Sequence, residues 1–178
     1  MVPEPSTQPH TAPRSAARVA AALAALLGLG SAAVSAYWAL GGSALLDTVG
    51  GEIEEWGRRR STSVLVVLWL VVVVKTVVAL AAPVLVAAPG RFPGWMVGRL
   101  PRTLGWIAGI VLLGYGGVLT AAGLLVQGGL IRASQDSDPR ALAWHAYLWD
   151  PWFALWGLAL LTSLWLTRPV HRQQTPAA

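Results

Sequence analysis

The sequence predicts an all-α protein, a four-helix transmembrane bundle with both termini in the cytoplasm. Three observations carry this prediction: hydrophobic residues make up 55% of the 178 residues, charged residues make up 12%, and the apolar residues gather in four long stretches. Soluble domains carry about twice that charged fraction. We therefore expect an integral membrane protein with no separate soluble domain.

The four stretches predict membrane helices at about 19–40, 63–88, 104–126 and 151–167, within one membrane domain over 19–167. A bilayer core needs about 20 apolar helical residues, so the first three are long enough, and the fourth is if it starts near Tyr147. The tails at 1–18 and 168–178 are rich in Pro, Ser, Thr and Gln and have nothing to bury. We expect both tails to be disordered in the cytoplasm.

The first helix has a second interpretation, a cleaved secretory signal. Arg14 and Arg18 precede its apolar core, and "AVSA" at 33–36 offers small residues for cleavage after Ala36. Two features favour a retained helix instead. The apolar run continues to Leu40, and small residues recur every four positions, a spacing that lets membrane helices pack closely. This small-residue ridge consists of Ala16, Ala20, Ala24, Gly28, Ala32 and Ala36.

The orientation rests on the arginines, because Lys and Arg are enriched in the cytoplasmic segments of membrane proteins. With the N-terminus inside, seven of the twelve arginines lie inside and five outside. The "RRR" at 58–60 opposes this orientation, whereas the loop between the second and third helices supports it with three arginines and no acid. Arginine outnumbers lysine twelve to one, a bias of GC-rich bacterial genomes, so we expect a multi-pass protein of a bacterial plasma membrane.

The connection before the fourth helix contains two helix-start signals. Asp138–Pro139 and Asp150–Pro151 each place a capping acid before a proline at the first helical position. Since the residue before proline avoids the helical region, Asp150 should break the chain. We expect a short interfacial helix at about 139–149 and then the fourth helix from Pro151. The alternative is one continuous, kinked helix from 139 to 167.

Tryptophan and glycine also follow the expected layout. Most of the ten tryptophans fall near the expected membrane interfaces, where aromatic rings form belts. Trp149, Trp152 and Trp156 share one helix face by spacing, which is typical of a packing seam and less often of a ligand wall. In the third helix, Gly105 and Gly109 have the GxxxG spacing of closely packed helices. We expect this helix at the centre of the bundle, and the alternative is a dimer face.

Several function classes are excluded or disfavoured. The chain has no cysteine, which excludes disulfides, thiol catalysis and thiolate metal sites. The net charge of +5 comes from basic residues that flank apolar spans, so we expect no nucleic-acid partner. The histidines and carboxylates show none of the spacings of a metal site, and we expect no metal and no cofactor. The partners we expect are membrane lipids and other membrane proteins.

Two motifs carry a resemblance to a known group. At "YWALGG" (residues 37–42) and "LWDPWF" (residues 148–153) the chain resembles small four-pass bacterial integral membrane proteins catalogued only as a domain of unknown function. The marks of that group correspond here to Trp38, the glycine pair at 41–42 and Asp150–Pro151. Its members often place a histidine shortly before the first tryptophan, whereas this chain has Ser35, Ala36 and Tyr37. The resemblance implies a fold and a compartment but no activity, and the departure counts against a histidine site there.

Two sets of residues are candidates for chemistry. His145 and Asp150 have the types of an acid–base pair, although Asp150 is also explained as a helix cap and His145 as an interfacial polar residue. Lys75 lies near the centre of the second stretch, about 18 Å from either end, beyond the reach of snorkelling. No acid lies at a matching depth. Lys75 then either faces the interior, bonded to Thr76, to Tyr115, to carbonyls near 114–117 or to water, or loses its proton. The alternative is a lysine that the helix merely tolerates and that has no role.

These candidates leave two functions open. The first is a small polytopic accessory or envelope component without catalysis. The second is a membrane-embedded enzyme or binder of a lipid or isoprenoid that enters between the first and fourth helices from the outer leaflet. In the second hypothesis, the ligand cavity has His145 and Asp150 at its mouth and Lys75 at its floor. Its walls are formed by Tyr37, Trp38, Trp149 and Trp152. The missing intramembrane acid argues against a proton-coupled exporter.

Overall fold

The computed structural model describes residues 12–134 and 137–168, and every regular element within them is helical. The four longest helices are α1 (Ala12–Ala39), α3 (Thr62–Val86), α5 (Arg99–Gln127) and α7 (Asp150–Leu166). Five shorter elements connect them: η1 (Leu46–Thr48), α2 (Gly51–Arg59), α4 (Gly94–Val97), α6 (Pro139–Trp144) and η2 (His145–Trp149). The four long helices cover the four expected ranges, but α1 begins at Ala12 and not near 19, and α5 begins at Arg99 and not near 104.

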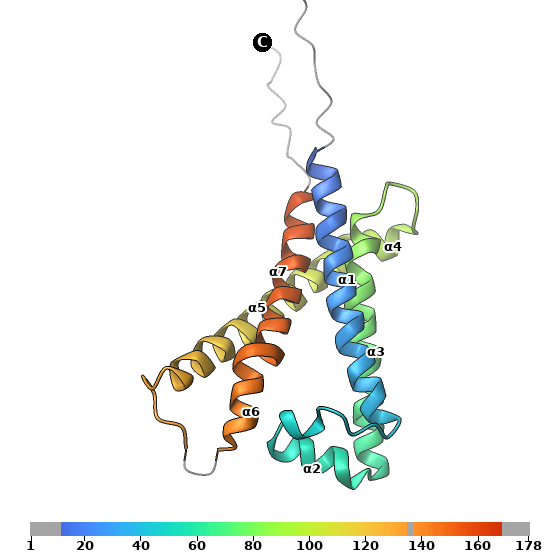
Figure 1. Ribbon diagram of the computed structural model, residues 1–178. Helices are drawn as coiled ribbons and strands as arrows, with labels where there is room; N and C mark the ends of the chain where they lie inside the picture. Colours follow the sequence, from blue (N-terminus) through green and yellow to red (C-terminus); the bar gives the residue numbers. More distant parts are fainter. Residues whose placement is uncertain (1–11, 135–136, 169–178) are drawn as a thin grey trace, which may run out of the picture.

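The long helices form a bundle in which α1 lies beside both α3 and α7, and α5 crosses α7 obliquely (Figure 1). The start of α1, the end of α7 and the short helix α4 share one end of the bundle, which we call the termini end. The elements α2 and α6 lie at the other end, which we call the cap end. Successive long helices therefore run from one end of the bundle to the other in alternation.

Three of the helical segments are long and apolar enough to cross a membrane: Arg14–Ala39, Thr62–Val86 and Gly94–Gln127. Their apolar side chains point outward as well as inward. On α3, Val66, Val73 and Val77 are 56–63% exposed, and on α5, Ile110 and Val118 are exposed to a similar degree. A water-soluble helix would bury this surface.

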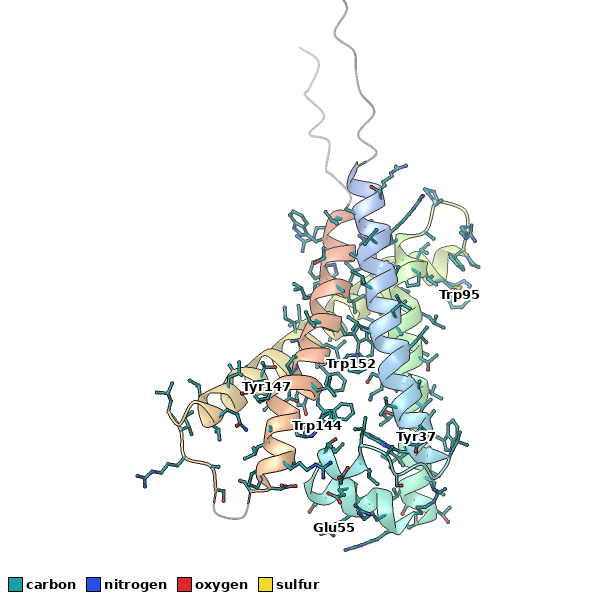
Figure 2. The ribbon with its side chains drawn as sticks, viewed as in Figure 1. Tyr37, Glu55, Trp95, Trp144, Tyr147 and Trp152 are labelled. Atoms are coloured by element: carbon teal, nitrogen blue, oxygen red, sulfur yellow. The ribbon has the colours of Figure 1, made fainter. Side chains whose placement is uncertain are left out.

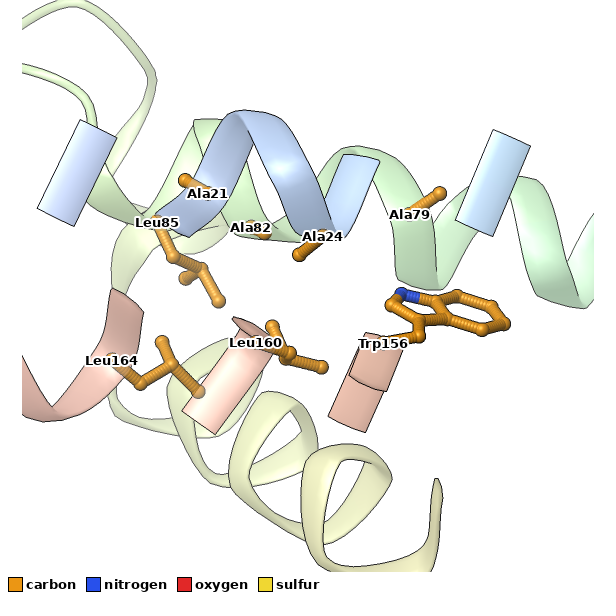
Figure 3. Close-up of a cluster of buried hydrophobic side chains, with 8 residues drawn as sticks. All are labelled: Ala21, Ala24, Ala79, Ala82, Leu85, Trp156, Leu160 and Leu164. Carbon is orange, nitrogen blue, oxygen red and sulfur yellow. The ribbon is translucent and has the colours of Figure 1, made fainter. Parts of the chain in front are cut away.

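The core lies where α1, α3 and α7 meet (Figure 3). Small residues on α1 and α3 let these two helices approach closely, and large side chains from α7 fill the space beside them. The buried cluster consists of Ala21, Ala24, Ala79, Ala82, Leu85, Trp156, Leu160 and Leu164. Of the small-residue ridge expected on the first helix, the members from Ala20 to Ala32 are buried, Ala36 is half-buried and Ala16 is exposed.

The crossing of α5 and α7 depends on glycine. A methyl group on Gly116 would lie 2.5 Å from the carbonyl oxygen of Asp150, and one on Gly157 would lie 2.8 Å from the carbonyl oxygen of Gly109. Neither backbone can move away without separating the helices. By contrast, Gly114 and Gly117 face open space. The central position expected for the glycine-rich helix is wrong, because α5 packs mainly against α7 through one face and the core lies between α1, α3 and α7.

The expected break at Asp150–Pro151 is wrong, because the chain is helical without interruption from Pro139 to Leu166. Both Trp149 and Asp150 have right-handed helical backbone angles. The five residues before Asp150 form a π turn, η2, in which the amide of Asp150 donates to the carbonyl of His145. A proline lacks an amide and crowds the carbonyl of the preceding turn, and the wider π turn relieves that conflict within the helix.

The other helix start expected in this connection is present. Asp138 precedes α6 and its Oδ1 accepts a hydrogen bond from the backbone amide of Arg140 at 2.8 Å. The expected N-terminal tail is shorter than 1–18, because α1 already begins at Ala12. Residues 1–11 and 169–178, which we expected to be disordered, lie outside the described residues.

The helix α2 was not expected. Its sequence "GEIEEWGRR" places acids in the first turn and arginines in the last, which complements the helix dipole. Two pairs four residues apart, Glu54 with Arg58 and Glu55 with Arg59, form ion pairs of 2.7 and 2.8 Å. Arg60 ends the helix in a left-handed conformation. The "RRR" that weakens the charge argument thus belongs in part to a helix at the cap end.

Candidate functional site

His145 and Asp150 lie together at the junction of η2 and α7. Their side chains approach with Nδ1 and Oδ1 3.2 Å apart, and Asp150 is only 3% exposed. In an ordinary α-helix residues five apart point about 140° away from each other. The π turn between them rotates the two side chains onto one face. The structure therefore brings together the pair that the sequence proposed, through a feature that the sequence did not predict.

The second ring nitrogen of His145 is also engaged. Its Nε2 lies 3.1 Å from the carbonyl oxygen of Val49, which follows η1. A backbone carbonyl only accepts, so Nε2 carries a proton and donates to Val49. The contact at Nδ1 then needs one more proton, held by the imidazole or by the carboxyl group of Asp150. Both ring nitrogens of His145 thus have protein partners.

A second set of contacts joins the same segments. Trp149 donates from Nε1 to the hydroxyl of the fully buried Thr48 at 3.1 Å. Arg140 of α6 pairs with Asp47 of η1 at 2.9 Å. We call the contacts of His145, Asp150 and Trp149 with Thr48 and Val49 the cap clasp. It fastens the connection after α1 to the start of α7, about 100 residues away in the chain.

The tryptophans proposed as ligand walls also join segments of the chain, and Figure 2 labels one of them, Trp152. Trp38 donates from Nε1 to the carbonyl of Ala44 at 2.9 Å, and its ring meets the edge of the Trp149 ring at 5.8 Å between centroids. Trp152 lies between α7 and α1 and donates to the carbonyl of Leu27 at 2.9 Å. Tyr37 accepts from the amide of Ala44 at 3.4 Å. These three polar atoms, like Nε1 of Trp149, already have a protein partner.

Lys75 points into the bundle, between α1 and α7. Its Nζ donates to the hydroxyl of Ser35 on α1 at 2.9 Å, and it lies 5.3 Å from the centroid of the Phe153 ring on α7. Ser35 is 3% exposed. The expected partners on α3 and α5 are wrong. The hydroxyl of Thr76 bonds to Val72 of its own helix, and the Tyr115 ring packs against Phe153.

The proposed residues thus form two separate clusters in the structure. The cap clasp lies at the cap end, and Lys75 with Ser35 and Phe153 lies in the middle of the bundle. Four cavities of about 320–490 Å³ open at the two ends of the bundle, and none of these four is lined by His145, Asp150, Lys75 or the tryptophans proposed as walls. Within 12–134 and 137–168, no three His, Asp or Glu side chains gather as metal ligands.

Sequence reasoning missed the partners on the other side of each contact. Thr48, Val49 and Phe153 carry no signal of their own in the sequence. One clue was available: Ser31 and Ser35 are polar residues one turn apart in a helix made mostly of alanine, glycine and leucine, and both are buried. A buried hydroxyl in such a helix needs a polar partner.

A family described as a protein of unknown function (DUF3995) matches residues 28–160. The chain belongs to this family. The DUF3995 match begins inside α1 and ends inside α7, so it includes both sides of the cap clasp, Lys75 and the motifs at 37–42 and 148–153. Its description names no activity, and no roles pass from it to individual residues. Comparison with the curated proteins and with the solved structures gave no match.

Proposed function

We propose that the chain is a four-pass membrane protein of the bacterial plasma membrane that serves as an accessory or envelope component without catalysis. The observation that carries this proposal is the engagement of every candidate side chain by protein atoms. His145 uses both ring nitrogens within the cap clasp, and Trp38, Trp149 and Trp152 each donate to an atom of another segment. A ring nitrogen or an indole N–H that is already bonded to the protein is not available to a substrate.

The membrane location rests on the outward apolar faces. Three helices have the length and composition of membrane spans, and their exposed valines and leucines are stable only against lipid. For the fourth pass, α7 extends about 25 Å and, together with η2, about 33 Å, which matches a hydrocarbon core of about 30 Å. The cap end then lies outside and the termini end in the cytoplasm, and α1 remains as a packed helix.

One observation favours the second candidate, a binder of a lipid or isoprenoid. Lys75 places an ammonium in the interior opposite a neutral hydroxyl and an aromatic face, without an acid to balance it among the described residues. An intramembrane charge that lacks a counter-charge is a common mark of a ligand site. A ligand phosphate that reached Lys75 from the outer leaflet would pass between α1 and α7.

Photolabelling separates the two candidates. The full chain in lipid nanodiscs is irradiated with a trace of a diazirine-bearing polyprenyl phosphate, and the labelled residues are mapped by mass spectrometry. The accessory role predicts label on outward positions such as Val73 and Val77, undiminished by excess unlabelled polyprenyl phosphate. Label at Phe153 or Trp152 that excess ligand removes would contradict it and establish the binder.

A further inference from the structure

A cavity of about 490 Å³ opens at the termini end of the bundle. Arginines from three long helices line it: Arg14 and Arg18 of α1, Arg102 of α5, and Arg168 just after α7. The remaining wall is mostly apolar and includes Leu85, Val86, Ala87, Ala88, Pro89 and Leu166. A second cavity of about 350 Å³ shares Arg18 and the end of α3 and adds Arg91. The cavities therefore combine cationic groups with an apolar surface.

The positive charge at this end is not balanced by the described part of the chain. Its six described arginines are Arg14, Arg18, Arg91, Arg99, Arg102 and Arg168. The described carboxylates lie in the connection after α1, in α2, and from residue 138 to the start of α7. The described ion pairs are all formed by these carboxylates, and none includes an arginine of the termini end.

Two of the arginines are held in place by neutral partners. Arg102 donates from Nη2 to the carbonyl of Leu164 at 2.9 Å and to the hydroxyl of Thr167 at 2.8 Å. A guanidinium has five N–H donors, so three of those on Arg102 have no partner among the described residues. Arg168 lies over the ring of Trp106, 4.2 Å from its centroid. Fixing the side chains before a ligand arrives lowers the entropy that binding would cost.

We propose that this cavity binds the phosphate of an anionic phospholipid of the cytoplasmic leaflet. Arginine forks match phosphate oxygens, and basic pockets between membrane helices on the cytoplasmic side suit anionic headgroups. A free phosphate ion offers the same oxygens, but it has no acyl chain to contact the apolar surface beside the arginines. The inference rests on the proposed membrane orientation, which places the termini end at the cytoplasmic interface.

Native mass spectrometry of the full chain in mild detergent tests the proposal. Phosphatidylglycerol should be retained in preference to phosphatidylcholine. Arg18→Gln should weaken that retention by about fivefold, the effect of one basic residue near an anionic headgroup. Arg18 is exposed and lines both cavities, so its loss leaves the core intact. Arg14→Gln should act in the same direction, which guards against an unfolded variant.

Arg99→Gln is the matched control. Arg99 lies at the same end and carries the same charge, but it lines neither cavity, so this variant should retain the lipid like the original chain. Equal retention of the two lipids, or equal weakening by Arg99→Gln and Arg18→Gln, would overturn the proposal. Displacement of phosphatidylglycerol by millimolar inorganic phosphate would assign a free anion instead and overturn the lipid. Cysteine labelling tests the orientation separately, so the two failures are distinguishable.

Discussion

Lys75, in the middle of α3, donates a hydrogen bond to the hydroxyl of Ser35 on α1 across 2.9 Å. The ammonium thus meets a dipole and, at 5.3 Å, the face of Phe153, in place of a carboxylate. Three helices converge on this one charge. Removing Lys75 leaves a neutral hydroxyl in the interior, whereas removing Ser35 leaves a buried charge without its hydrogen-bond acceptor.

Removing Lys75 should not destabilise the protein. Lys75→Met supplies an unbranched apolar chain of similar length and takes a charge out of the interior, and the hydroxyl of Ser35 can turn to a carbonyl of its own helix. We expect an equal or higher midpoint in thermal unfolding in detergent, and the same for Lys75→Leu. A midpoint several degrees below that of the original chain would contradict this account of Lys75.

Removing Ser35 should have the opposite effect. Ser35→Ala leaves the ammonium without its only described hydrogen-bond acceptor, at a cost of about 1–3 kcal/mol in the free energy of unfolding. Ser31→Ala is the matched control, since Ser31 is a buried serine one turn away on the same helix with no contact to Lys75. Both variants are measured by denaturant unfolding in the same detergent. The prediction fails if the two alanine variants are equally stable.

The inward direction of Lys75 has its own test. A fluorophore attached to a cysteine at position 75 should resist quenchers dissolved in the lipid phase. Probes at Val73 and Val77, which are 56% and 63% exposed on the outer face, should be strongly quenched. The reverse pattern would place Lys75 against lipid and remove any reason to assign it a role.

The sequence predicted the long helices of this fold because apolar runs of about 20 residues leave few alternatives. Its local signals were weaker guides. Asp150–Pro151 reads as a helix start, yet the helix continues, since packing of α7 against α1 and α5 outweighs the preference of a residue before proline. The helix α2 was missed because its signal lies in the order of its charges, with no apolar run to mark it.

The sequence could predict the conspicuous residues of the candidate site but not the atoms that they contact. His145, Asp150 and Lys75 are conspicuous by residue type, and the structure gives each of them a contact. Their partners are a serine in an alanine-rich helix and a backbone carbonyl 96 residues away in the chain. The serine differs from its neighbours only by a hydroxyl group, and every residue has a backbone carbonyl. Only the three-dimensional packing of distant segments identifies such atoms.

Replacing Asp150 by asparagine should leave the stability of the protein nearly unchanged. In Asp150→Asn the side-chain amide can donate to Nδ1 of a neutral His145, whose Nε2 still donates to Val49, so the cap clasp keeps both hydrogen bonds. We expect a change of about 1 kcal/mol or less in the free energy of unfolding. Asp150→Ala removes the partner and should cost more. An Asn variant as unstable as the Ala variant would show that the clasp needs the carboxylate charge.

Glycine substitutions test the crossing of α5 and α7. Gly116→Ala would push a methyl group into the backbone of α7 near Asp150 and Ala154, so we expect a loss of about 1–3 kcal/mol, as for an overpacked core. Gly117→Ala, one residue along the same helix, meets open space and should be neutral or slightly stabilising. Unfolding in detergent compares the two. Equal stability of the variants would contradict the close approach of these helices.

We propose a four-pass chain with the termini end in the cytoplasm and the cap end outside. The chain has no cysteine, so single cysteines can be placed at Ser6, Gly94, Ser134 and Thr175 without further changes. An impermeant thiol reagent applied to intact cells should label position 134 and leave 6, 94 and 175 unlabelled until the cells are opened. Labelling at 94 without labelling at 134 would contradict this orientation.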